Sequence, residues 1–257
     1  MPNRKAARPL MHDVHATVPG TQRPAWMASI HDIYARMRMA AAQGPYPVSF
    51  EGLDLLVLPE VYAPNLFTDT VWFARRLAPI VRNSSLLEIG SGTGAIAIKC
   101  ALAGAKVLAT DINPAAVKNT LLNVRAIKAD VDVRESDLYA NVRVSEQFDF
   151  IFWAHPFNNV PYSVTDPLML SGMDHEYRAL ESYVARASKH LTRDGRLLLG
   201  TGDSADLSTL DAICRRYNRE RVILVRELLP LEYGGDAKIE YQLCELAPLN
   251  AATSVEH

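Results

Sequence analysis

Cysteine, long apolar runs and an excess of charge of one sign are all scarce in this sequence of 257 residues. The chain holds three cysteines, an odd number, and no two of them form a CxxC pair. This pattern argues against a disulfide framework and gives no support to a metal site. It favours a reducing compartment, so we expect a cytoplasmic protein.

The charged residues nearly balance, with 27 Lys and Arg against 29 Asp and Glu, for a formal net charge of -2. Such a balance supplies no general basic field, so we do not expect nucleic acid as a partner. No apolar stretch approaches the roughly 20 residues that a membrane helix requires. The first 16 residues also lack the apolar middle of a secretion signal. We therefore expect no association with a membrane.

From residue 69 onward, apolar segments of strand length alternate with segments of helical period. Strands are predicted at 85–89, 106–110, 131–135, 148–153 and 196–200. Helices are predicted at about 69–82 and at 94–103, 114–127 and 177–191. This alternation implies right-handed crossovers and a parallel sheet covered on both faces. Two further runs, 221–228 and 238–246, predict antiparallel strands. The expected fold is a doubly wound α/β fold with a mostly parallel seven-stranded sheet.

The N-terminal part has a different character. Residues 1–23 mix basic residues, Pro and Gly without periodicity, which predicts a loose arm. Residues 24–43 carry apolar positions at helical spacing, and Glu51-Gly52 centres a predicted hairpin. We therefore divide the chain into an N-terminal part, 1–60, and a main domain, 61–250. The helix either packs on the main domain or forms a lid over a ligand.

Three glycines, Gly90, Gly92 and Gly94, follow a predicted strand and open a helix. Bare backbone at this place lets a ligand approach the N-terminus of the helix. Asp111 ends the next strand, where a carboxylate in such folds accepts hydrogen bonds from ribose hydroxyls. Together these features predict a nucleoside ligand. Taken singly, the glycines could form a tight turn only, and Asp111 could merely cap the following helix.

Glu88 bears on the kind of nucleoside. The run that starts at Gly90 also has the GxGxxG/A spacing of dinucleotide sites, so the glycines leave both ligands open. A carboxylate two residues before the first glycine can face an ammonium group, whereas it would repel a pyrophosphate at close range. This position therefore favours a nucleoside that carries an amino acid.

The stretch Glu88-Ile-Gly90-Ser-Gly92-Thr-Gly94 resembles motif I of the class I S-adenosylmethionine-dependent methyltransferases. The resemblance spans about residues 61–246 and implies S-adenosylmethionine as cofactor. It implies that Asp111 holds the ribose and that Asp137 and Leu138 surround the adenine. The residues assigned to the cofactor in this way are Thr70, Glu88, Gly90, Ser91, Gly92, Thr93, Asp111, Ile112, Asp137, Leu138 and Ala154.

Residues 61–70, VYAPNLFTDT, are similar to the VxxP…DT stretch of the HemK-type glutamine amide methyltransferases. That resemblance implies that Asp69 and Thr70 lie near the methionine part of the cofactor. Where those relatives carry NPPY after the fourth strand, this chain has Ala154-His155-Pro156-Phe157. Their Asn holds a planar nitrogen in line with the methyl group, which alanine cannot do. The altered motif weakens the case for amide or nucleobase methylation.

Around this motif the candidates for catalysis are Trp153, His155, Phe157 and Tyr177. Further polar or aromatic groups of the same region are Asn158, Asn159, Tyr162, Asp174, His175 and Glu176. His155 could take a proton or orient a hydroxyl, or it could be a buried structural residue. The aromatic faces could stabilise a sulfonium cation. The two asparagines either replace the missing amide or form a turn.

These features predict a methyltransferase that acts on a nitrogen or oxygen of a small molecule or peptide, chiefly by positioning the reactants. Two alternatives stay open. The lost Asn and a possible lid also suit an enzyme that cyclises S-adenosylmethionine itself, as azetidine-2-carboxylate synthases do, and releases methylthioadenosine. A degraded motif also suits a noncatalytic cofactor-binding protein. The sequence leaves the oligomeric state open.

Overall fold

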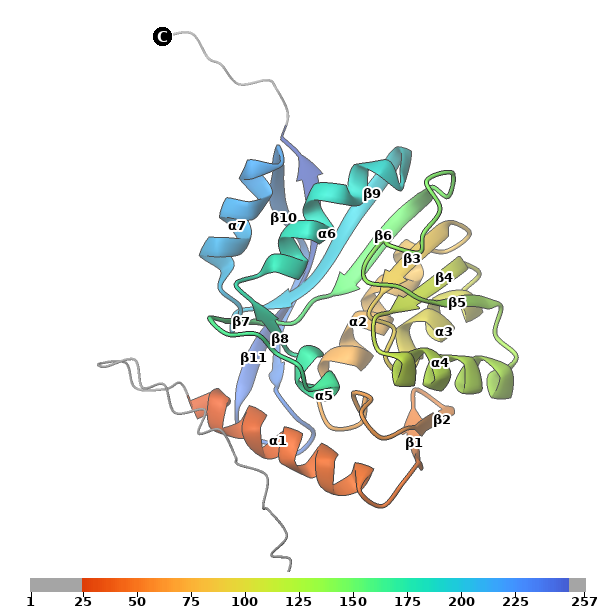
Figure 1. The fold of residues 1–257 in the computed structure, drawn as a ribbon, viewed down its shortest axis with the longest axis vertical. Helices are drawn as coiled ribbons and strands as arrows, with labels where there is room; N and C mark the ends of the chain where they lie inside the picture. Colours follow the sequence, from red (N-terminus) through yellow and green to blue (C-terminus); the bar gives the residue numbers. More distant parts are fainter. Residues whose placement is uncertain (1–24, 250–257) are drawn as a thin grey trace, which may run out of the picture.

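The computed structural model describes residues 25–249, with side chains from residue 32 onward. The predicted loose arm, 1–23, lies outside these residues. A seven-stranded sheet forms the middle layer and carries helices on both faces (Figure 1). In sheet order the strands are β10 (Arg219–Pro230), β11 (Lys238–Pro248), β9 (Leu191–Gly202), β6 (Phe148–Ala154), β3 (Ser85–Ile89), β4 (Lys106–Asp111) and β5 (Val131–Glu135).

The strand directions confirm the expected doubly wound fold. Strands β9, β6, β3, β4 and β5 run parallel, and β11 runs antiparallel to β9 and β10. The chain runs outward in opposite directions from β3 and β6, so these two neighbours form the switch point of the sheet. Ligands of such sheets bind outside the carboxyl ends of the strands at this point.

The helices are α1 (Ala25–Ala41), α2 (Asp69–Ile80), α3 (Ala95–Leu102), α4 (Pro114–Ile127), α5 (Pro167–Leu170), α6 (Arg178–Arg186) and α7 (Leu207–Arg216). The predicted helix over 177–191 is too long. Helix α6 ends at Arg186, a 3-10 turn follows, and β9 begins at Leu191, five residues before the predicted strand. Leu191 pairs with Phe148 of β6, and this pairing draws the segment into the sheet.

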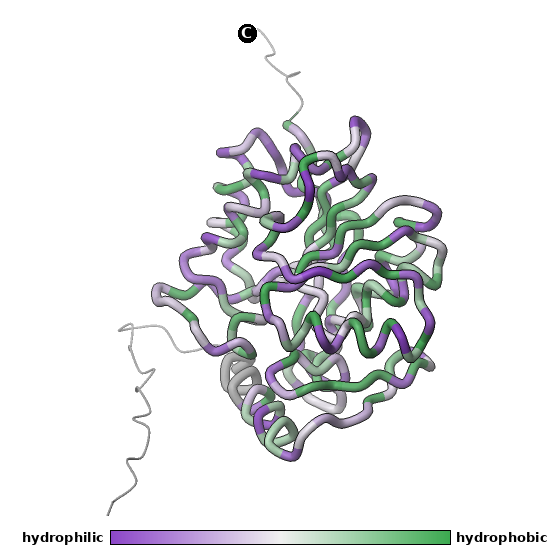
Figure 2. Tube along the Cα trace, turned by 45° about the vertical axis from the view of Figure 1, so that its right-hand side comes forward, coloured by the Kyte–Doolittle hydropathy of each residue, from purple (hydrophilic) through white to green (hydrophobic). Residues whose placement is uncertain are grey.

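Two hydrophobic clusters lie on opposite faces of the sheet, because side chains alternate along a strand. Leu86 packs with α2, α3 and the hairpin, whereas its neighbour Leu87 packs with α6 and α7. Figure 2 shows the hydrophobic segments (green) gathered in the inner strands. The three cysteines are buried and unpaired. Between residues 25 and 249, no helix is long and apolar enough to span a bilayer, and no cluster of potential metal ligands is present.

The predicted hairpin is formed by β1 (Tyr46–Phe50) and β2 (Leu53–Val57). Its turn residues Glu51 and Gly52 have φ angles of 51° and 78°, as a two-residue type I′ turn requires. Two buried asparagines of α4 hold β2 in place. Asn119 Oδ1 accepts a hydrogen bond from Leu58 N at 2.8 Å, and Asn123 Oδ1 accepts one from Leu56 N at 2.8 Å.

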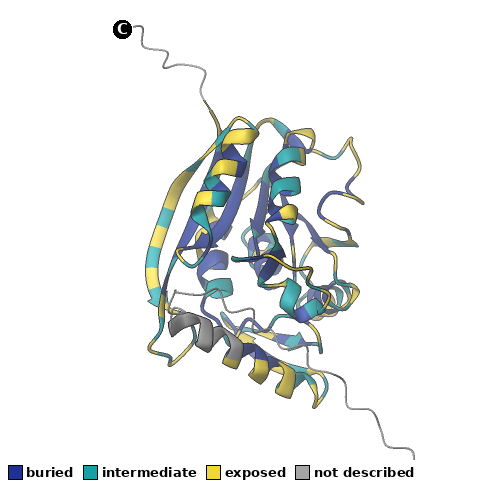
Figure 3. Cartoon of the chain, turned by 60° about the vertical axis from the view of Figure 1, so that its left-hand side comes forward, coloured by how far each residue is buried: buried dark blue, intermediate teal, exposed yellow. Residues whose placement is uncertain are grey.

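Helix α1 lies across one end of the molecule, beside α5 and the lower ends of the C-terminal strands (Figure 1). Its outer face is exposed, while Ile33, Tyr34 and Met37 are buried (Figure 3). Arg38 forms an ion pair with Asp166 at 2.8 Å, next to α5. Arg36 forms a second pair, with Glu232 in the turn between β10 and β11. The helix therefore joins two segments that are far apart in the sequence.

We expect Asn123→Leu to lower the free energy of unfolding by about 2–3 kcal/mol, because the Leu56 N–H and the Thr93 carbonyl lose the side chain that pairs with them. Urea unfolding followed by circular dichroism measures this loss. The exposed Lys118 of the same helix supplies the control, and Lys118→Ala is expected to stay within about 0.5 kcal/mol of the parent. Equal effects of the two substitutions would contradict the tethering role of Asn123.

Candidate functional site

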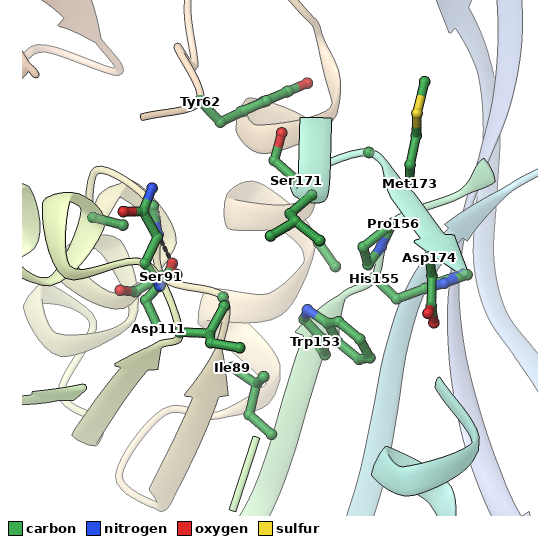
Figure 4. A pocket seen from close by; sticks show the side chains of 18 of the residues that line it. Tyr62, Ile89, Ser91, Asp111, Trp153, His155, Pro156, Ser171, Met173 and Asp174 are labelled. Carbon is green, nitrogen blue, oxygen red and sulfur yellow. Dashed lines mark hydrogen bonds between the residues drawn. The ribbon is translucent and has the colours of Figure 1, made fainter. Parts of the chain in front are cut away.

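A cavity of about 580 Å³ lies at the carboxyl ends of β3, β4 and β6. All eleven residues predicted to bind the cofactor line this cavity, together with Trp153, His155 and Phe157. Figure 4 shows Ile89, Asp111 and Ser91 on one side, and Trp153 and His155 on the other. The fold therefore brings all the predicted cofactor residues and three of the four catalytic candidates to one place.

In the turn between β3 and α3, two of the glycines have different structural roles. Gly92 lines the cavity with a φ of +56°, and no other atom lies within 4 Å of the place where a Cβ would stand. Gly94 has a φ of +81°, and a Cβ there would lie 2.8 Å from Thr120 Cγ2 of α4. Gly92 thus leaves room for a ligand, whereas Gly94 allows close packing of two helices.

Asp111 connects β4 to this turn. One carboxylate oxygen accepts a hydrogen bond from Gly92 N at 2.9 Å, and the other accepts one from Asn113 N at 2.9 Å. Helix α4 is capped by the side chain of Asn113, which accepts from Ala115 N at 2.9 Å. The carboxylate of Asp111 is therefore not the cap of α4, and it lines the cavity. Burial raises the pKa of Asp111 above its ordinary value.

Glu88 is the most unusual group of the site. Its side chain is 2% exposed, and among the described residues its Oε2 atom has no hydrogen-bond partner. Burial, and then the nearby charge of Asp111, raise the pKa of Glu88 well above its ordinary value. An unpartnered buried carboxyl group is costly. A cationic group of a ligand would favour its ionised form and remove that cost.

The loop after β5 closes the other end of the cavity. The Ser136 hydroxyl donates to the Leu138 carbonyl at 2.9 Å and accepts from Asn141 N at 2.9 Å, which holds the loop in a tight turn. Leu138 has a φ of 49° and is buried, while Asp137 is exposed at the rim. The sequence predictions missed the contribution of Ser136, although a serine before Asp-Leu is a signal for such a turn.

His155 lies at the end of β6 and is 2% exposed. Its Nε2 atom is 3.0 Å from the Thr201 hydroxyl, and the rings of Phe157 and Tyr177 are each 5.6 Å from it. Burial lowers the pKa of His155 to about 3. A side chain with this pKa is neutral at pH 7 and a weak base. The structure therefore favours a structural role for His155 over that of a proton acceptor.

Tyr177 is fully buried and is not among the residues that line the cavity. Its hydroxyl donates to the Phe157 carbonyl at 2.5 Å and accepts from Asp206 N at 3.1 Å. The predicted contact of Tyr177 with a bound cation thus has no support in the geometry, because its ring does not line the cavity. Tyr177 instead holds the backbone of Phe157. Tyr162, 40% exposed, does not line the cavity either.

The segment after β6 does not form the turn that was one of the two alternatives for Asn158 and Asn159. Strand β7 (Asn158–Val160) pairs in parallel with β8 (Met173–His175). The Asn158 side chain adds to this pairing, since its Nδ2 donates to the Gly172 carbonyl at 2.6 Å. Asp174 accepts hydrogen bonds from Ala179 N and Leu180 N, at the start of α6.

The Methyltransferase small domain family model matches residues 68–216. The chain belongs to this family. Its fold and domain are those of the class I S-adenosylmethionine-dependent methyltransferases. The matched residues include the glycine turn, Asp111, Asp137 and residues 153–157 at the end of β6.

Relatives of this methyltransferase domain share part of its length. A Methanocaldococcus jannaschii protein assigned to the protein N5-glutamine methyltransferases is 40% identical over 111 residues, which cover 43% of this chain and 54% of the relative. The release factor glutamine methyltransferase of Koribacter versatilis is 35% identical over 116 residues, which cover 44% of this chain and 40% of the relative. The chain therefore spans about half the length of the curated relatives it matches.

Solved structures confirm the fold of the domain. The 16S rRNA N2 G1207 methyltransferase of T. thermophilus, in complex with AdoMet and guanosine, aligns with a TM-score of 0.53 and 17% identity. The alignment covers 78% of this chain and 50% of that protein. At this identity the similarity supports the Rossmann-like methyltransferase fold alone.

The low pKa of His155, about 3, predicts a loss of stability in acid. Below about pH 6.5 the unfolded chain binds a proton at this residue, whereas the folded chain does not until about pH 3. Stability therefore falls as the pH drops through 6.5, by about 2 kcal/mol at pH 5. Urea unfolding at pH 8 and pH 5 should show a smaller drop for His155→Gln than for the parent. Equal drops would contradict a neutral buried His155.

Proposed function

We propose that the protein transfers the methyl group of S-adenosylmethionine to a nitrogen or oxygen of a small molecule or peptide. This proposal rests on a single cavity. Glu88, Gly92 and Asp111 line one part of it, and Trp153, Ala154 and Phe157, at the end of β6, line another. The residues present fit the cofactor. An unpartnered buried carboxyl group suits its ammonium group, and open space beside Gly92 suits its close approach.

When bound, S-adenosylmethionine supplies a methyl group on a positively charged sulfur. In our proposal Glu88 faces the ammonium group, Asp111 holds the ribose hydroxyls, and Asp137 and Leu138 bind the adenine. Trp153, Ala154 and Phe157 separate this part of the cavity from solvent and leave the acceptor to approach from the side of β7. Orientation of the two reactants supplies most of the rate, because the leaving thioether needs no protonation.

Asn158 replaces part of the missing amide at position 154. Its Nδ2 atom is the one beside the Gly172 carbonyl, since only a donor can lie 2.6 Å from a carbonyl oxygen. The other terminal atom of the Asn158 amide is therefore its oxygen, Oδ1. Asn158 is one of the residues that line the cavity. That oxygen can accept a hydrogen bond from an N–H or O–H of the acceptor. This arrangement supports a nitrogen or oxygen acceptor.

The charges of the cavity favour a small molecule or peptide over nucleic acid. Six acidic side chains line it, namely Glu60, Asp69, Glu88, Asp111, Asp137 and Asp174. Among the described residues of the lining, the only arginine is Arg178, which already forms an ion pair with Glu176 at 2.6 Å. Glu60 and Asp174 are the two of these acids that have no assigned contact with the cofactor, and negative charge there would repel phosphate groups of an acceptor. The likeness to glutamine methyltransferases also supports membership of the HemK-type subgroup.

Incubation with S-adenosylmethionine, followed by mass spectrometry, tests the reaction. With no acceptor present we expect the cofactor to stay intact, and with candidate acceptors we expect S-adenosylhomocysteine. Methylthioadenosine with a cyclic amino acid would instead identify the cyclising enzyme considered above. Tight binding without any product would identify a noncatalytic protein. Either of these two results would overturn methyl transfer.

We expect Asp111→Ala to weaken the affinity for S-adenosylmethionine by about 1–3 kcal/mol, because the ribose hydroxyls would lose the carboxylate that accepts their hydrogen bonds. Isothermal titration calorimetry measures the change. Asp130→Ala is the matched control, since Asp130 is exposed and stands between α4 and β5. An unchanged affinity for Asp111→Ala would contradict the assignment of the ribose site.

A further inference from the structure

The indole N–H of Trp153 is a hydrogen-bond donor that the protein itself leaves unused. Trp153 lies near the end of β6, lines the cavity and is 7% exposed. Trp72 is buried to a similar degree and donates from Nε1 to Glu227 at 2.7 Å, whereas among the described residues no group accepts a hydrogen bond from Trp153. Buried tryptophans usually form a hydrogen bond through this N–H. A partner that is not part of the protein is therefore indicated.

This donor lies beside the glycine turn. Trp153 pairs with Ile89 in the parallel register of β6 and β3, and Gly90 follows Ile89 directly. A Cβ atom on Gly90 would lie 3.0 Å from Trp153 Nε1, so this nitrogen is next to bare backbone. Figure 4 shows the nitrogen on the side of the ring nearer to Ile89 and Asp111, away from His155. The N–H is thus located where the turn lets a ligand approach.

Other aromatic rings fix the orientation of the indole. The ring centroid of Tyr183 is 5.3 Å from that of Trp153, and the ring of His155 is 6.1 Å away at an angle of 66°. Tyr183 is itself fully buried, and its hydroxyl donates to the Leu198 carbonyl at 2.6 Å. A ligand that accepts a hydrogen bond from Trp153 therefore does not have to order this side chain first.

The charge of the cavity indicates which ligand group needs such a donor. Acidic side chains dominate the lining, and the only arginine among its described residues, Arg178, is paired with Glu176. An anionic group would be repelled there unless a donor received it. S-adenosylmethionine carries one such group, a carboxylate on the same carbon as its ammonium group. If Glu88 faces the ammonium group, this carboxylate lies close to the start of the glycine turn.

Two other donors near the turn are already engaged by the protein. The Ser91 hydroxyl is bonded to that of Thr120 at 3.0 Å, and Gly92 N donates to Asp111 at 2.9 Å. The N–H of Trp153 has no such partner. Hydrogen bonds to ionised groups are stronger than those between neutral groups. A carboxylate is therefore the ligand group that gains most from this donor.

We propose that Trp153 binds the carboxylate of the methionine part of S-adenosylmethionine through its indole N–H. This inference rests on the proposed function, because it takes S-adenosylmethionine as the ligand. It assigns the indole to recognition of the amino-acid group rather than to the sulfonium. Glu88 and Trp153 then hold the two opposite charges of that group from the neighbouring strands β3 and β6. Ligands without a carboxylate gain nothing from the N–H.

Four ligands separate the groups of the cofactor. S-adenosylmethionine carries all of them, and S-adenosylhomocysteine lacks only the methyl group and hence the sulfonium charge. Decarboxylated S-adenosylmethionine lacks the carboxylate, and methylthioadenosine lacks the whole amino-acid group. Trp153→Phe keeps an aromatic ring and removes the N–H. We expect calorimetry to show that this variant binds the first two ligands about tenfold more weakly than the parent and the last two unchanged.

Trp72→Phe is the matched control. Trp72 is buried and donates a hydrogen bond, as described above, but it is not among the residues that line the cavity. This variant is expected to bind all four ligands as the parent does. A comparison within the parent needs no variant at all, since S-adenosylmethionine should bind more tightly than its decarboxylated form. Equal binding of these two ligands by the parent would overturn the proposal.

Three results for Trp153→Phe would also overturn it. A loss for S-adenosylmethionine and its decarboxylated form, with S-adenosylhomocysteine unaffected, would assign the ring to the sulfonium. Unchanged affinity for all four ligands, with slower methyl transfer, would assign the N–H to the acceptor. An equal loss for all four would assign Trp153 to the shape of the cavity.

These titrations also distinguish the inference from the proposed function. None of them needs an acceptor, so an absence of methyl transfer would count against the proposed function alone, while the pattern of affinities would still test Trp153. Failure of all four ligands to bind the parent would overturn both.

Discussion

The turn at the carboxyl end of β3 is the constraint on which the rest of the site depends. It bends the backbone through left-handed conformations and directs Gly92 N toward Asp111, at the end of the neighbouring strand. This hydrogen bond joins two strands, one turn and the start of a helix at a single point. Thr120 and Asn123 of α4 secure the same turn through the carbonyls of Gly92 and Thr93. Because Asn123 also binds Leu56 of β2, the hairpin and the turn share one support.

Negative charge is concentrated where this turn meets the cavity. Glu88 and Asp111 are buried within the same site, and each raises the energetic cost of ionising the other. Asp69, which is half-buried, lines the same cavity. A folded protein retains such groups at a cost in stability, and the cost is offset when a cation binds. A cofactor that carries both an ammonium and a sulfonium group suits this arrangement.

The altered motif at the end of β6 keeps its backbone support although its side chains differ. The His155 ring forms a hydrogen bond with the Thr201 hydroxyl. The Tyr177 hydroxyl donates one to the Phe157 carbonyl. Asn158 lines the cavity four positions after Ala154, and the pairing of β7 with β8 holds it in position. In our proposal this residue supplies the amide oxygen that position 154 lacks.

Local patterns in the sequence were enough for the α/β class, for the seven strands of the main sheet, and for the residues that line the cavity beside the glycine turn, because those residues stand within a few positions of the strand ends. They did not predict helices α5 and α7. Asp111 and Glu88 could be placed on such grounds. Only the tertiary structure decided the end of α6, the strands β7 and β8, and the removal of Tyr177 from the cavity. It alone showed that Tyr34, Tyr62 and Tyr241 line the same cavity as Glu88 and Asp111. The physical reason is that these contacts join distant segments, so that no local period or spacing encodes them.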